Sequence, residues 1–361
     1  MPSLPVEFYD PLSMAEEKMA PVKVLIALPL DEALVEQVRA VDPRLEVGLL
    51  DRDGALLLSG RPLPPDFDAE AAQKRLEAAL ADTEVLYGFP PSPERAREFL
   101  ARAPRLRWFQ AASAGVDRLE QSGFLERQVV VTNSSGVAAT PIGEYVLMVM
   151  LMFAKGAHRL FRAQAERRWT RFLPAELRGR TVGVVGMGHI GREVARLAQA
   201  FGCRVLAIRG SAVERRRGQP PADELLPPSD LPYLLSESDY VVLSVPLTER
   251  TRRLIGEQEL RAMKPAAVLV NISRGAVVDE AALVRALKEG WIGGAALDVF
   301  EREPLSEESE LWGMENVIVS PHVSGATQVY FQRAVPIFCE NLCRYLEGRP
   351  LLNVIDPQRG Y

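Results

Sequence analysis

The chain has 361 residues, which is long enough for two domains that each bury a core of their own. Hydrophobic residues make up 47% of the sequence and charged residues 25%, and these ordinary proportions exclude a disordered or fibrous protein. A formal net charge of -5 argues against nucleic acid or an anionic membrane as a partner, because either would need a concentrated positive field.

The cysteines and the amino terminus predict a cytoplasmic protein. Cys203, Cys339 and Cys343 are too few and too scattered for a disulfide framework or a metal site, which favours a reducing compartment. The amino terminus carries acidic residues early and has no apolar core segment, so no secretory signal is expected. The strongest apolar run, residues 145–153, is about half the length needed to cross a bilayer and predicts a buried helix.

The first third of the chain has the pattern of a parallel sheet. Between residues 22 and 131, five short β-rich runs alternate with charged, amphipathic segments. This alternation predicts strands joined by helices. Residues 140–167 then predict one long helical region, apolar at first and rich in arginine later, followed by a connector at residues 169–180. We expect the domain change in this region.

A second series of strand-like runs fills the middle of the chain. Six of them lie between residues 181 and 321, enough for a full dinucleotide-binding sheet, whereas residues 220–232 predict a proline-rich loop. Residues 330–346 predict an amphipathic helix that could return to the first domain. The expected fold is therefore α/β, with two Rossmann-like or flavodoxin-like domains of parallel sheets: a discontinuous substrate domain of residues 1–150 and 328–361, and an inserted cofactor domain of residues 151–327.

A glycine-rich turn follows the first strand of the second series. In TVGVVGMGHIGR, residues 181–192, Gly186 permits the tight turn, Gly188 lets the backbone approach a pyrophosphate, and Gly191 allows close packing of helix on strand. The amino terminus of the following helix offers free N–H groups and the positive end of its dipole. A glycine-rich turn without a ligand is the alternative. The flanking strand, helix and second strand favour dinucleotide binding.

The end of the next strand predicts which dinucleotide is bound. NAD enzymes hold the ribose 2′-hydroxyl with an acidic residue there, but this strand ends in Ile208, Arg209, Gly210 and Ser211. Arg209, the hydroxyl of Ser211 and one of the arginines at 215–217 could instead bind a 2′-phosphate. NADP(H) is therefore favoured. The alternative is that Arg209 is a solvated loop residue and that NAD(H) is used.

Three further segments make the interpretation specific, namely VLVNISRGAVVDEAAL around Arg274, ALDVFEREPL around Glu303 and VSPHVSGAT around His322. Together with GMGHIG they closely resemble the D-isomer-specific 2-hydroxyacid dehydrogenase family, in which the motifs occur in this order. The resemblance covers most of the chain, includes AGVD at residues 114–117, and is greatest to the glyoxylate and hydroxypyruvate reductase branch. It implies an oxidoreductase that transfers a hydride between NAD(P)H and a small 2-keto or D-2-hydroxy acid.

Reduction of a keto acid explains why these residue types occur together. The hydride leaves negative charge on the carbonyl oxygen, so a positioned acid must deliver a proton, and His322 is the candidate. Glu303 would favour the protonated imidazole and fix its orientation. Arg274 would hold the substrate carboxylate with its planar donor fork. Outside its motif, His322 would more readily be interpreted as an ordinary loop residue. Glu301 lies in the same motif as Glu303, and the family pattern selects the second.

The resemblance also implies contacts for substrate and cofactor. The backbone N–H groups of Ala114 and Gly115 should bind the substrate carboxylate, and Asp298 should accept a hydrogen bond from the nicotinamide carboxamide. The remaining expected cofactor contacts are His189, Ile190, Val245, Pro246, Thr251, Ile272, His322 and Gly325, in addition to the glycine loop, Arg209 and Ser211. The pair Gly143-Glu144 stands where the family usually has Ala-Glu.

Other functions remain open at this point. A phosphite dehydrogenase would keep the arginine, glutamate and histidine, whereas a formate dehydrogenase would have glutamine in place of Glu303. A dinucleotide-sensing binding protein of the same fold, similar to a corepressor, is an alternative of a different class. The full set of Arg274, Glu303 and His322 favours an enzyme. A homodimer is expected from the family, through the apolar helix from Ile142 and the arginine-rich stretch after it.

Overall fold

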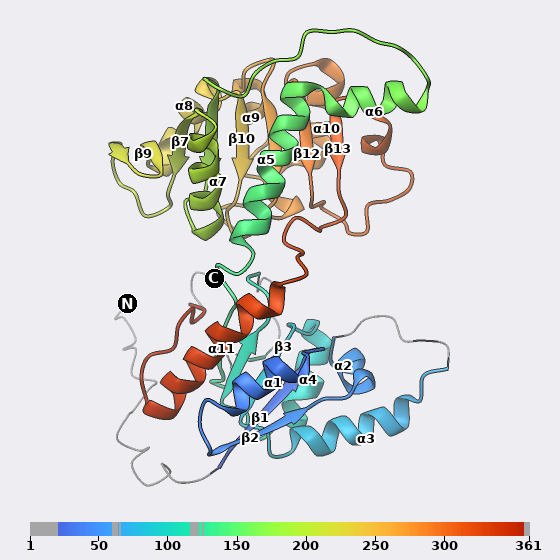
Figure 1. The fold of residues 1–361 in the computed structure, drawn as a ribbon, viewed down its shortest axis with the longest axis vertical. Helices are drawn as coiled ribbons and strands as arrows, with labels where there is room; N and C mark the ends of the chain where they lie inside the picture. The colour runs from blue at the N-terminus through green and yellow to red at the C-terminus, as the bar shows by residue number, and fades with distance from the viewer. Residues whose placement is uncertain (1–20, 60–63, 65, 116–122, 125, 357–361) are drawn as a thin grey trace. The chain divides into compact units, whose positions relative to one another are not determined.

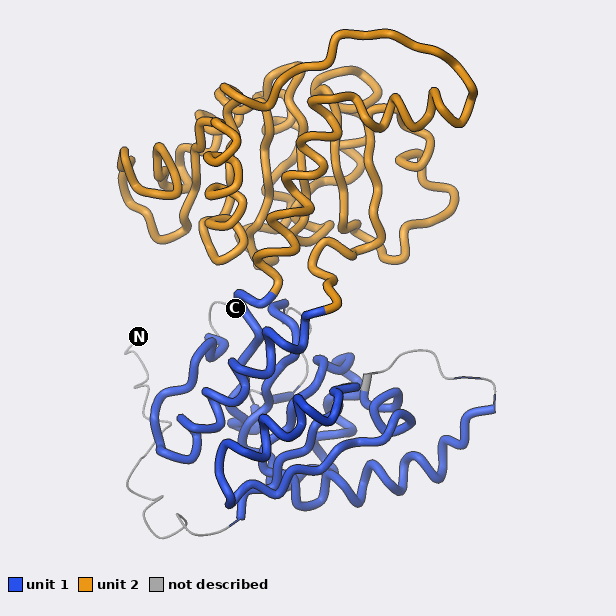
Figure 2. Tube along the Cα trace, in the orientation of Figure 1, with its two compact units in different colours: residues 1–137, 329–361 blue, residues 138–328 orange. Residues whose placement is uncertain are grey.

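The computed structural model describes residues 21–59, 64, 66–115, 123–124 and 126–356. Two compact units form the chain, one from residues 1–137 and 329–361 and the other from residues 138–328 (Figure 2). The predicted α/β fold, with one domain inserted into a discontinuous other, is confirmed. The expected boundary at residue 150 falls inside a helix, Ala139–Lys155, and the units divide before that helix because its buried face packs within the second unit.

The first unit is built on a five-stranded parallel sheet in the order β2-β1-β3-β4-β5 (Figure 1). All five predicted strand runs form strands. Their bounds are Val22–Ala27 for β1, Leu45–Leu49 for β2, Val85–Gly88 for β3, Trp108–Ala111 for β4 and Val130–Thr132 for β5. Side chains alternate between the two faces of β1, because Leu25 packs in one core cluster while Val24 and Ile26 pack in the other.

Helices cover both faces of this sheet. Residues of α1 and α11 contribute to the core on one face, and residues of α2, α3 and α4 to the core on the other. The helices are Glu32–Arg39 (α1), Arg52–Ser59 (α2), Ala69–Leu80 (α3), Pro93–Arg102 (α4) and Tyr330–Glu347 (α11). The side chains of Asp31, Asp68 and Ser92 cap the amino termini of α1, α3 and α4. The last helix thus completes the first unit, as the sequence suggested.

The second unit contains an eight-stranded sheet in the order β13-β12-β11-β10-β6-β7-β9-β8. Every neighbouring pair is parallel except β8 and β9. The strands are Thr181–Val185 (β6), Arg204–Ile208 (β7), Arg216–Gln219 (β8), Ala222–Leu226 (β9), Tyr240–Leu243 (β10), Val268–Asn271 (β11), Gly294–Leu297 (β12) and Val317–Val319 (β13). The six predicted runs are all strands, and the order reverses between β6 and β10, where a doubly wound sheet binds its ligand.

Two layers of helices enclose this second sheet. Residues of α5 and α7 form the core on one face, and those of α8, α9 and α10 form it on the other. The helices are Ala139–Lys155 (α5), Ala157–Ala165 (α6), His189–Ala200 (α7), Leu231–Glu237 (α8), Glu257–Ala262 (α9) and Glu280–Glu289 (α10). A Cβ on Gly143 would lie 2.8 Å from Cγ of Glu193. The glycine that departs from the family pattern therefore allows α5 to pack closely on α7.

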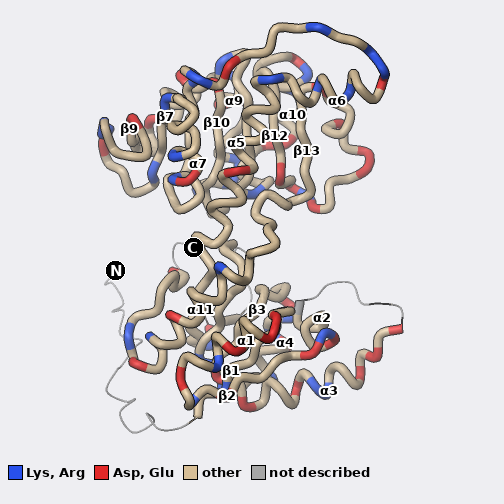
Figure 3. The backbone as a smooth tube through the Cα atoms, viewed as in Figure 1, with Lys and Arg blue, Asp and Glu red and all other residues tan. Residues whose placement is uncertain are grey.

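Two predictions within this unit are wrong. The single helix expected at residues 140–167 is broken at Gly156, which ends α5 in the left-handed conformation with φ of 65°. The loop expected at residues 220–232 contains β9, which joins the sheet beside β7. No helix in the described part of the chain is long and apolar enough to cross a membrane. Along the described residues of both units, Lys and Arg are interspersed with Asp and Glu (Figure 3).

Candidate active site

The glycine loop lies between β6 and α7, where the sheet order reverses. Gly186 has φ of 108°, and a Cβ on it would lie 2.6 Å from the carbonyl oxygen of Ser244. A Cβ on Gly191 would lie 2.0 Å from the carbonyl oxygen of Gly186. Only glycine fits these two positions. A Cβ on Gly188, in contrast, would meet nothing within 4 Å, so this position faces open space.

The first turn of α7 is suited to an anion. Gly188 is the N-cap of the helix and makes no side-chain cap, and His189 and Ile190 begin the first turn. Backbone N–H groups at a helix amino terminus bind phosphate through hydrogen bonds and the helix dipole. The open position at Gly188 therefore fits the pyrophosphate of a dinucleotide, and Gly186 and Gly191 hold the loop that presents it.

The turn after β7 carries the two residues expected at the 2′-position. The N–H of Arg209 donates to the carbonyl of Leu226 at 3.2 Å, and the N–H of Ala212 donates to the carbonyl of Arg209 at 2.9 Å. Both Arg209 and Ser211 are exposed. Within the described parts of the chain, the guanidinium of Arg209 has no hydrogen-bond or ion-pair partner.

The three neighbouring arginines differ from Arg209 because each has a carboxylate partner. Arg215 pairs with Asp230 and also lies over the ring of Tyr233, 4.2 Å from its centroid. Arg216 lies 3.3 Å from Glu214, and Arg217 lies 3.9 Å from Glu224. Arg209 is thus the cation in this region that remains available for a ligand.

Glu303 and His322 form the hydrogen-bonded pair that the motifs predicted. Nδ1 of His322 lies 2.8 Å from Oε2 of Glu303, while Oε1 of Glu303 accepts the N–H of Phe300 at 3.1 Å. Because a carboxylate only accepts, Nδ1 carries hydrogen and Nε2 is the nitrogen left for a substrate. His322 is exposed and has φ of 55°, an uncommon backbone conformation outside glycine.

Arg274 lies in the loop after β11. The neighbouring strand, β12, leads to the segment that carries Glu303. Its Nη1 donates to the carbonyl of Ser273 at 2.8 Å, and its own carbonyl accepts a hydrogen bond from the side chain of Asn271 at 3.0 Å. A Cβ on Gly275 would lie 1.8 Å from the carbonyl carbon of Phe300. The segment after Arg274 therefore packs directly against the backbone that Glu303 binds.

Asp298 lies at the end of β12 and is 1% exposed. Its carboxylate accepts hydrogen bonds from Ser320 Oγ at 2.6 Å, from the N–H of Val323 at 2.9 Å and from the N–H of Ser324 at 2.9 Å. Its carbonyl accepts the N–H of His322 at 2.8 Å. Asp298 was expected to bind the nicotinamide, and the structure gives it three partners in the loop that carries His322.

The segment after β10 contains further expected cofactor contacts. Oγ1 of Thr251 donates to the carbonyl of Pro246 at 2.6 Å and accepts the N–H of Thr248 at 2.8 Å, which holds the loop in a closed turn. Val245 and Pro246 lie two and three residues after the end of β10, and Ile272 is buried directly after β11. A Cβ on Gly325, three residues after His322, would contact Ala138 and Ile142. Because β6, β7 and β10 to β13 are parallel, these residues follow strands that end at one edge of the sheet.

Ala114 and Gly115, which were expected to bind the substrate carboxylate, lie in the first unit shortly after β4. The carbonyl of Ala114 accepts a hydrogen bond from Nδ2 of Asn133 at 2.9 Å, and the carbonyl of Gly115 accepts one from Oγ of Ser113 at 2.9 Å. These bonds fix the backbone that was expected to offer N–H groups to the substrate. The rest of the AGVD motif, at residues 116 and 117, lies outside the described residues.

Comparison with known proteins gives the family. The family model described as "D-isomer specific 2-hydroxyacid dehydrogenase, NAD binding domain" matches residues 147–324. A glyoxylate reductase of Korarchaeum cryptofilum is 37% identical over 300 residues, which cover 81% of this chain and 88% of that protein. The chain belongs to the D-isomer-specific 2-hydroxyacid dehydrogenases. This dehydrogenase is therefore an NAD(P)-dependent oxidoreductase whose substrate is a small 2-hydroxy or 2-keto acid.

Solved structures of two relatives have the same architecture as this dehydrogenase. A D-isomer specific 2-hydroxyacid dehydrogenase from Xanthobacter autotrophicus, in complex with NADPH and MES, is 30% identical with a TM-score of 0.76, covering 95% of this chain and 100% of that chain. An NADPH-dependent glyoxylate/hydroxypyruvate reductase from Sinorhizobium meliloti, in complex with NADP and sulfate, is 27% identical with a TM-score of 0.73, covering 94% and 100%.

Sequence reasoning missed two residues of the site. Ser320 bonds the carboxylate of Asp298, and its hydroxyl also lies 2.6 Å from that of Tyr145 on α5. Ser320 lies only two residues before His322 at the end of a strand, which was a usable signal. Tyr145 opens an otherwise apolar run, and its hydroxyl needs a partner when it is buried. Its position therefore indicated that the hydroxyl makes a hydrogen bond, but it did not indicate the partner.

Proposed function

We propose that this dehydrogenase reduces glyoxylate or hydroxypyruvate with NADPH. The observation that carries the proposal is the Glu303–His322 pair. It leaves Nε2 of a half-exposed imidazole free to donate a proton, at the edge of the sheet where the glycine loop also lies. The relative named glyoxylate reductase is 37% identical, and the Sinorhizobium meliloti protein is named as an NADPH-dependent glyoxylate/hydroxypyruvate reductase. These names favour keto-acid reduction over phosphite oxidation.

Each residue of the proposed site has its own role in the reduction of a keto acid. Bound NAD(P)H supplies the hydride. Protonated His322 donates the hydrogen on Nε2 to the carbonyl oxygen as negative charge develops there. Glu303, anchored to the N–H of Phe300, binds Nδ1–H and holds the ring in one orientation. Arg274 binds the substrate carboxylate with its donor fork, and the N–H groups of Ala114 and Gly115 are proposed to bind it as well.

The glycine loop and the turn after β7 support a preference for NADP(H). The uncapped amino terminus of α7 would bind the pyrophosphate, and Val245, Pro246 and Thr251 would line the adenosine. Arg209 is exposed and has no ionic partner among the described residues, which suits a doubly charged 2′-phosphate. Ser211, in the same turn, would add a hydroxyl donor. The carboxylate of Asp298 accepts three hydrogen bonds and has about four acceptor sites, so it is proposed to accept a further one from the nicotinamide carboxamide.

The test of the proposed function follows cofactor absorbance with several substrates in parallel. Glyoxylate, hydroxypyruvate, pyruvate and phenylpyruvate are offered with NADPH and with NADH, and phosphite is offered with the oxidised cofactors. Oxidation of NADPH by glyoxylate or hydroxypyruvate is the expected result. A preference for NADH would contradict the cofactor assignment alone. Binding of dinucleotide without turnover of any keto acid would contradict the reductase and favour a sensor or a phosphite dehydrogenase.

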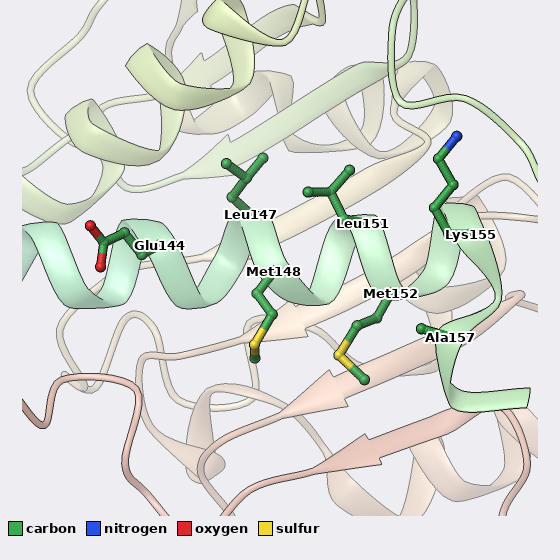
Figure 4. Close-up of a pocket in the computed structure, with 7 residues that line it drawn as sticks. All are labelled: Glu144, Leu147, Met148, Leu151, Met152, Lys155 and Ala157. Carbon is green, nitrogen blue, oxygen red and sulfur yellow. The ribbon is translucent and has the colours of Figure 1, made fainter. Parts of the chain in front are cut away.

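A homodimer is proposed from the exposed face of α5. A shallow groove runs along this helix, and its lining is mostly aliphatic apart from a charged residue at either end (Figure 4). The residues that line it are Glu144, Leu147, Met148, Leu151, Met152, Lys155 and Ala157. Beyond it, Trp169 is 91% exposed and Leu173 is 98% exposed. An exposed apolar groove of this kind is typical of a protein interface, and the family resemblance predicts that a second copy of the chain occupies it.

The cysteines bear on where the reaction occurs. Cys203, Cys339 and Cys343 are free thiols in the structure. Free thiols persist in a reducing compartment. The cytoplasm is therefore proposed as the location of this dehydrogenase.

A further inference from the structure

A chain of hydrogen bonds links α5 to the loop that carries His322. The hydroxyl oxygen of Tyr145 lies 2.6 Å from Oγ of Ser320, which in turn lies 2.6 Å from Oδ1 of Asp298. All three residues belong to the second unit. None of them was needed for the chemistry assigned to Arg274, Glu303 and His322. Tyr145 and Ser320 also have no part in the proposed binding of the cofactor.

The chemistry of these groups fixes the direction of the hydrogen bonds. A carboxylate only accepts, so Ser320 must give its single hydroxyl hydrogen to Asp298. The bond between the two hydroxyl groups then needs the hydrogen of Tyr145, and Tyr145 is the donor. Burial is the main cause that raises the pKa of Tyr145, Ser320 opposes it, and the charge of Asp298 raises the pKa further. Tyr145 therefore stays protonated and remains a donor.

Asp298 transmits this restraint to the backbone at His322. Besides Ser320, its carboxylate binds the N–H groups of Val323 and Ser324, and its carbonyl binds the N–H of His322. These bonds enclose His322, whose φ of 55° is unfavourable for a residue with a Cβ. A conformation of this kind persists only where the surrounding contacts determine it. The position of the imidazole thus depends on the orientation of the Asp298 carboxylate.

We propose that Tyr145 is a positioning residue for the proton donor: through Ser320 and Asp298 it holds the backbone at His322 in the conformation that brings the imidazole onto Glu303. Tyr145 touches no reacting atom. The inference rests on the proposed catalytic role of His322 and deepens it. It gives α5, the first helix of the second unit, a role in positioning the proton donor in addition to its role in the core.

The first test replaces Tyr145→Phe, which removes the hydroxyl and keeps the ring. We expect kcat to fall about fivefold, the effect of losing one net hydrogen bond, while the Kd of NADPH stays within about twofold. Hydrogen exchange of the peptide that spans residues 318–328 should become faster, because the amides of Val323 and Ser324 lose restraint. Tyr240→Phe is the matched control. It removes a buried hydroxyl that bonds the carbonyl of Met150 on α5, and both readouts should stay unchanged.

The second test asks whether Tyr145 acts through Ser320. Ser320→Ala should lower kcat at least as much as Tyr145→Phe, and the double variant should be no worse than Ser320→Ala, because both changes break one chain of bonds. Ser320→Thr keeps a hydroxyl and should restore most of the turnover. Additive losses in the double variant would overturn the proposal, since they would show independent effects.

The exchange measurement separates this proposal from the proposed function. Unchanged exchange at residues 318–328 in Tyr145→Phe overturns the positioning role, whatever substrate the dehydrogenase uses. If the unaltered protein turns over no 2-keto acid, the proposed function is overturned instead, and exchange still decides whether Tyr145 restrains the His322 loop. Faster exchange together with an unchanged kcat would show a purely structural bond and would also overturn the proposal.

Discussion

Glu303 binds His322 with one carboxylate oxygen, at 2.8 Å from Nδ1, and the backbone of Phe300 with the other, at 3.1 Å. A glutamate that is fixed at both oxygens has lost the freedom of its side chain. It can therefore hold the imidazole in one orientation and one tautomer, which is what proton delivery from Nε2 requires. The short segment from Phe300 to Glu303 thus orients His322, the proposed proton donor.

Substitution of the proton donor should separate chemistry from binding. In His322→Ala we expect kcat to fall by about two to four orders of magnitude, because a positioned acid contributes that much to a proton transfer. The Kd of NADPH, measured by fluorescence, should change little, since the proton is needed only in the transition state. Turnover close to that of the unaltered enzyme would remove His322 from the mechanism.

Glu303→Gln tests whether Glu303 orients His322 for proton donation. The amide keeps an oxygen for the N–H of Phe300, but its NH₂ group cannot accept the hydrogen on Nδ1 of His322. We expect kcat to fall about 10- to 100-fold, less than in His322→Ala, as is usual for a group that orients an essential residue. Glu301→Gln is the matched control, because Glu301 lies 3.8 Å from Arg253 in a loose ion pair and should affect kcat little. Equal losses in the two variants would contradict the selection of Glu303.

Gly191 and Gly188 of the glycine loop differ in the space around them, because Gly191 is crowded by backbone atoms and Gly188 faces open space. Gly191→Ala would place a Cβ 2.0 Å from the carbonyl oxygen of Gly186, so we expect about 1–3 kcal/mol of destabilisation together with loss of cofactor binding. Gly188→Ala meets nothing within 4 Å and should cost at most about 1 kcal/mol of stability as a changed N-cap. It should nevertheless weaken NADPH binding, because the methyl group occupies the space proposed for the pyrophosphate.

Thermal unfolding and cofactor titration of both variants check this contrast. Loss of binding with an intact melting temperature in Gly188→Ala is the informative result. If Gly188→Ala bound NADPH as tightly as the unaltered enzyme, the pyrophosphate would have to lie elsewhere than over this turn.

The sequence predicted the strands well because their signal is local. All five runs of the first unit and all six runs of the second are strands, and most of them are buried runs rich in β-branched and aliphatic residues between helical segments. The strands β2 and β13 are only partly buried. It missed β9 because Glu224 occupies an inward position between Ala222 and Leu226. The buried carboxylate pairs with Arg204 of β7 at 2.7 Å, and that partner is 20 residues away.

Part of the site could be predicted from the sequence and part could not. The glycine loop, the Glu303–His322 pair and the exposed Arg209 follow from motifs whose residues lie close together in the chain. The bond between Tyr145 and Ser320 joins residues 175 positions apart, and no pattern along the sequence indicates it. The break at Gly156 had a local signal, because glycine commonly ends a helix, but the apolar run on one side and the arginines on the other hid it.

Cofactor preference should depend on Arg209 more than on any other arginine near it. Arg209→Asp replaces a free cation by a carboxylate that would repel a 2′-phosphate, so we expect kcat/KM for NADPH to fall about 10- to 100-fold. The value for NADH should change little or rise. Arg216→Asp is the control, because Arg216 already pairs with Glu214 at 3.3 Å. Equal losses with both cofactors, or an equal effect of the control, would overturn the assignment of Arg209.

The apolar groove on α5 makes the oligomeric state testable. Met148 is 46% exposed at the middle of the groove, and Leu147 and Leu151 lie beside it (Figure 4). A second copy seated on this face would bury Met148, and a carboxylate at that position would then be buried without a partner. The cost of such a burial is several kcal/mol, enough to separate a dimer held by this surface.

Light scattering across a range of concentrations should therefore give a dimer for the unaltered dehydrogenase and a monomer for Met148→Glu. Phe201→Glu, which places the same charge on a residue that is 41% exposed at the end of α7, should remain a dimer. Circular dichroism of both variants checks that the fold is retained. A monomer at every concentration of the unaltered protein would contradict the homodimer, and a Met148→Glu dimer would move the interface away from α5, because no folded dimer could bury that charge at its centre without loss of affinity.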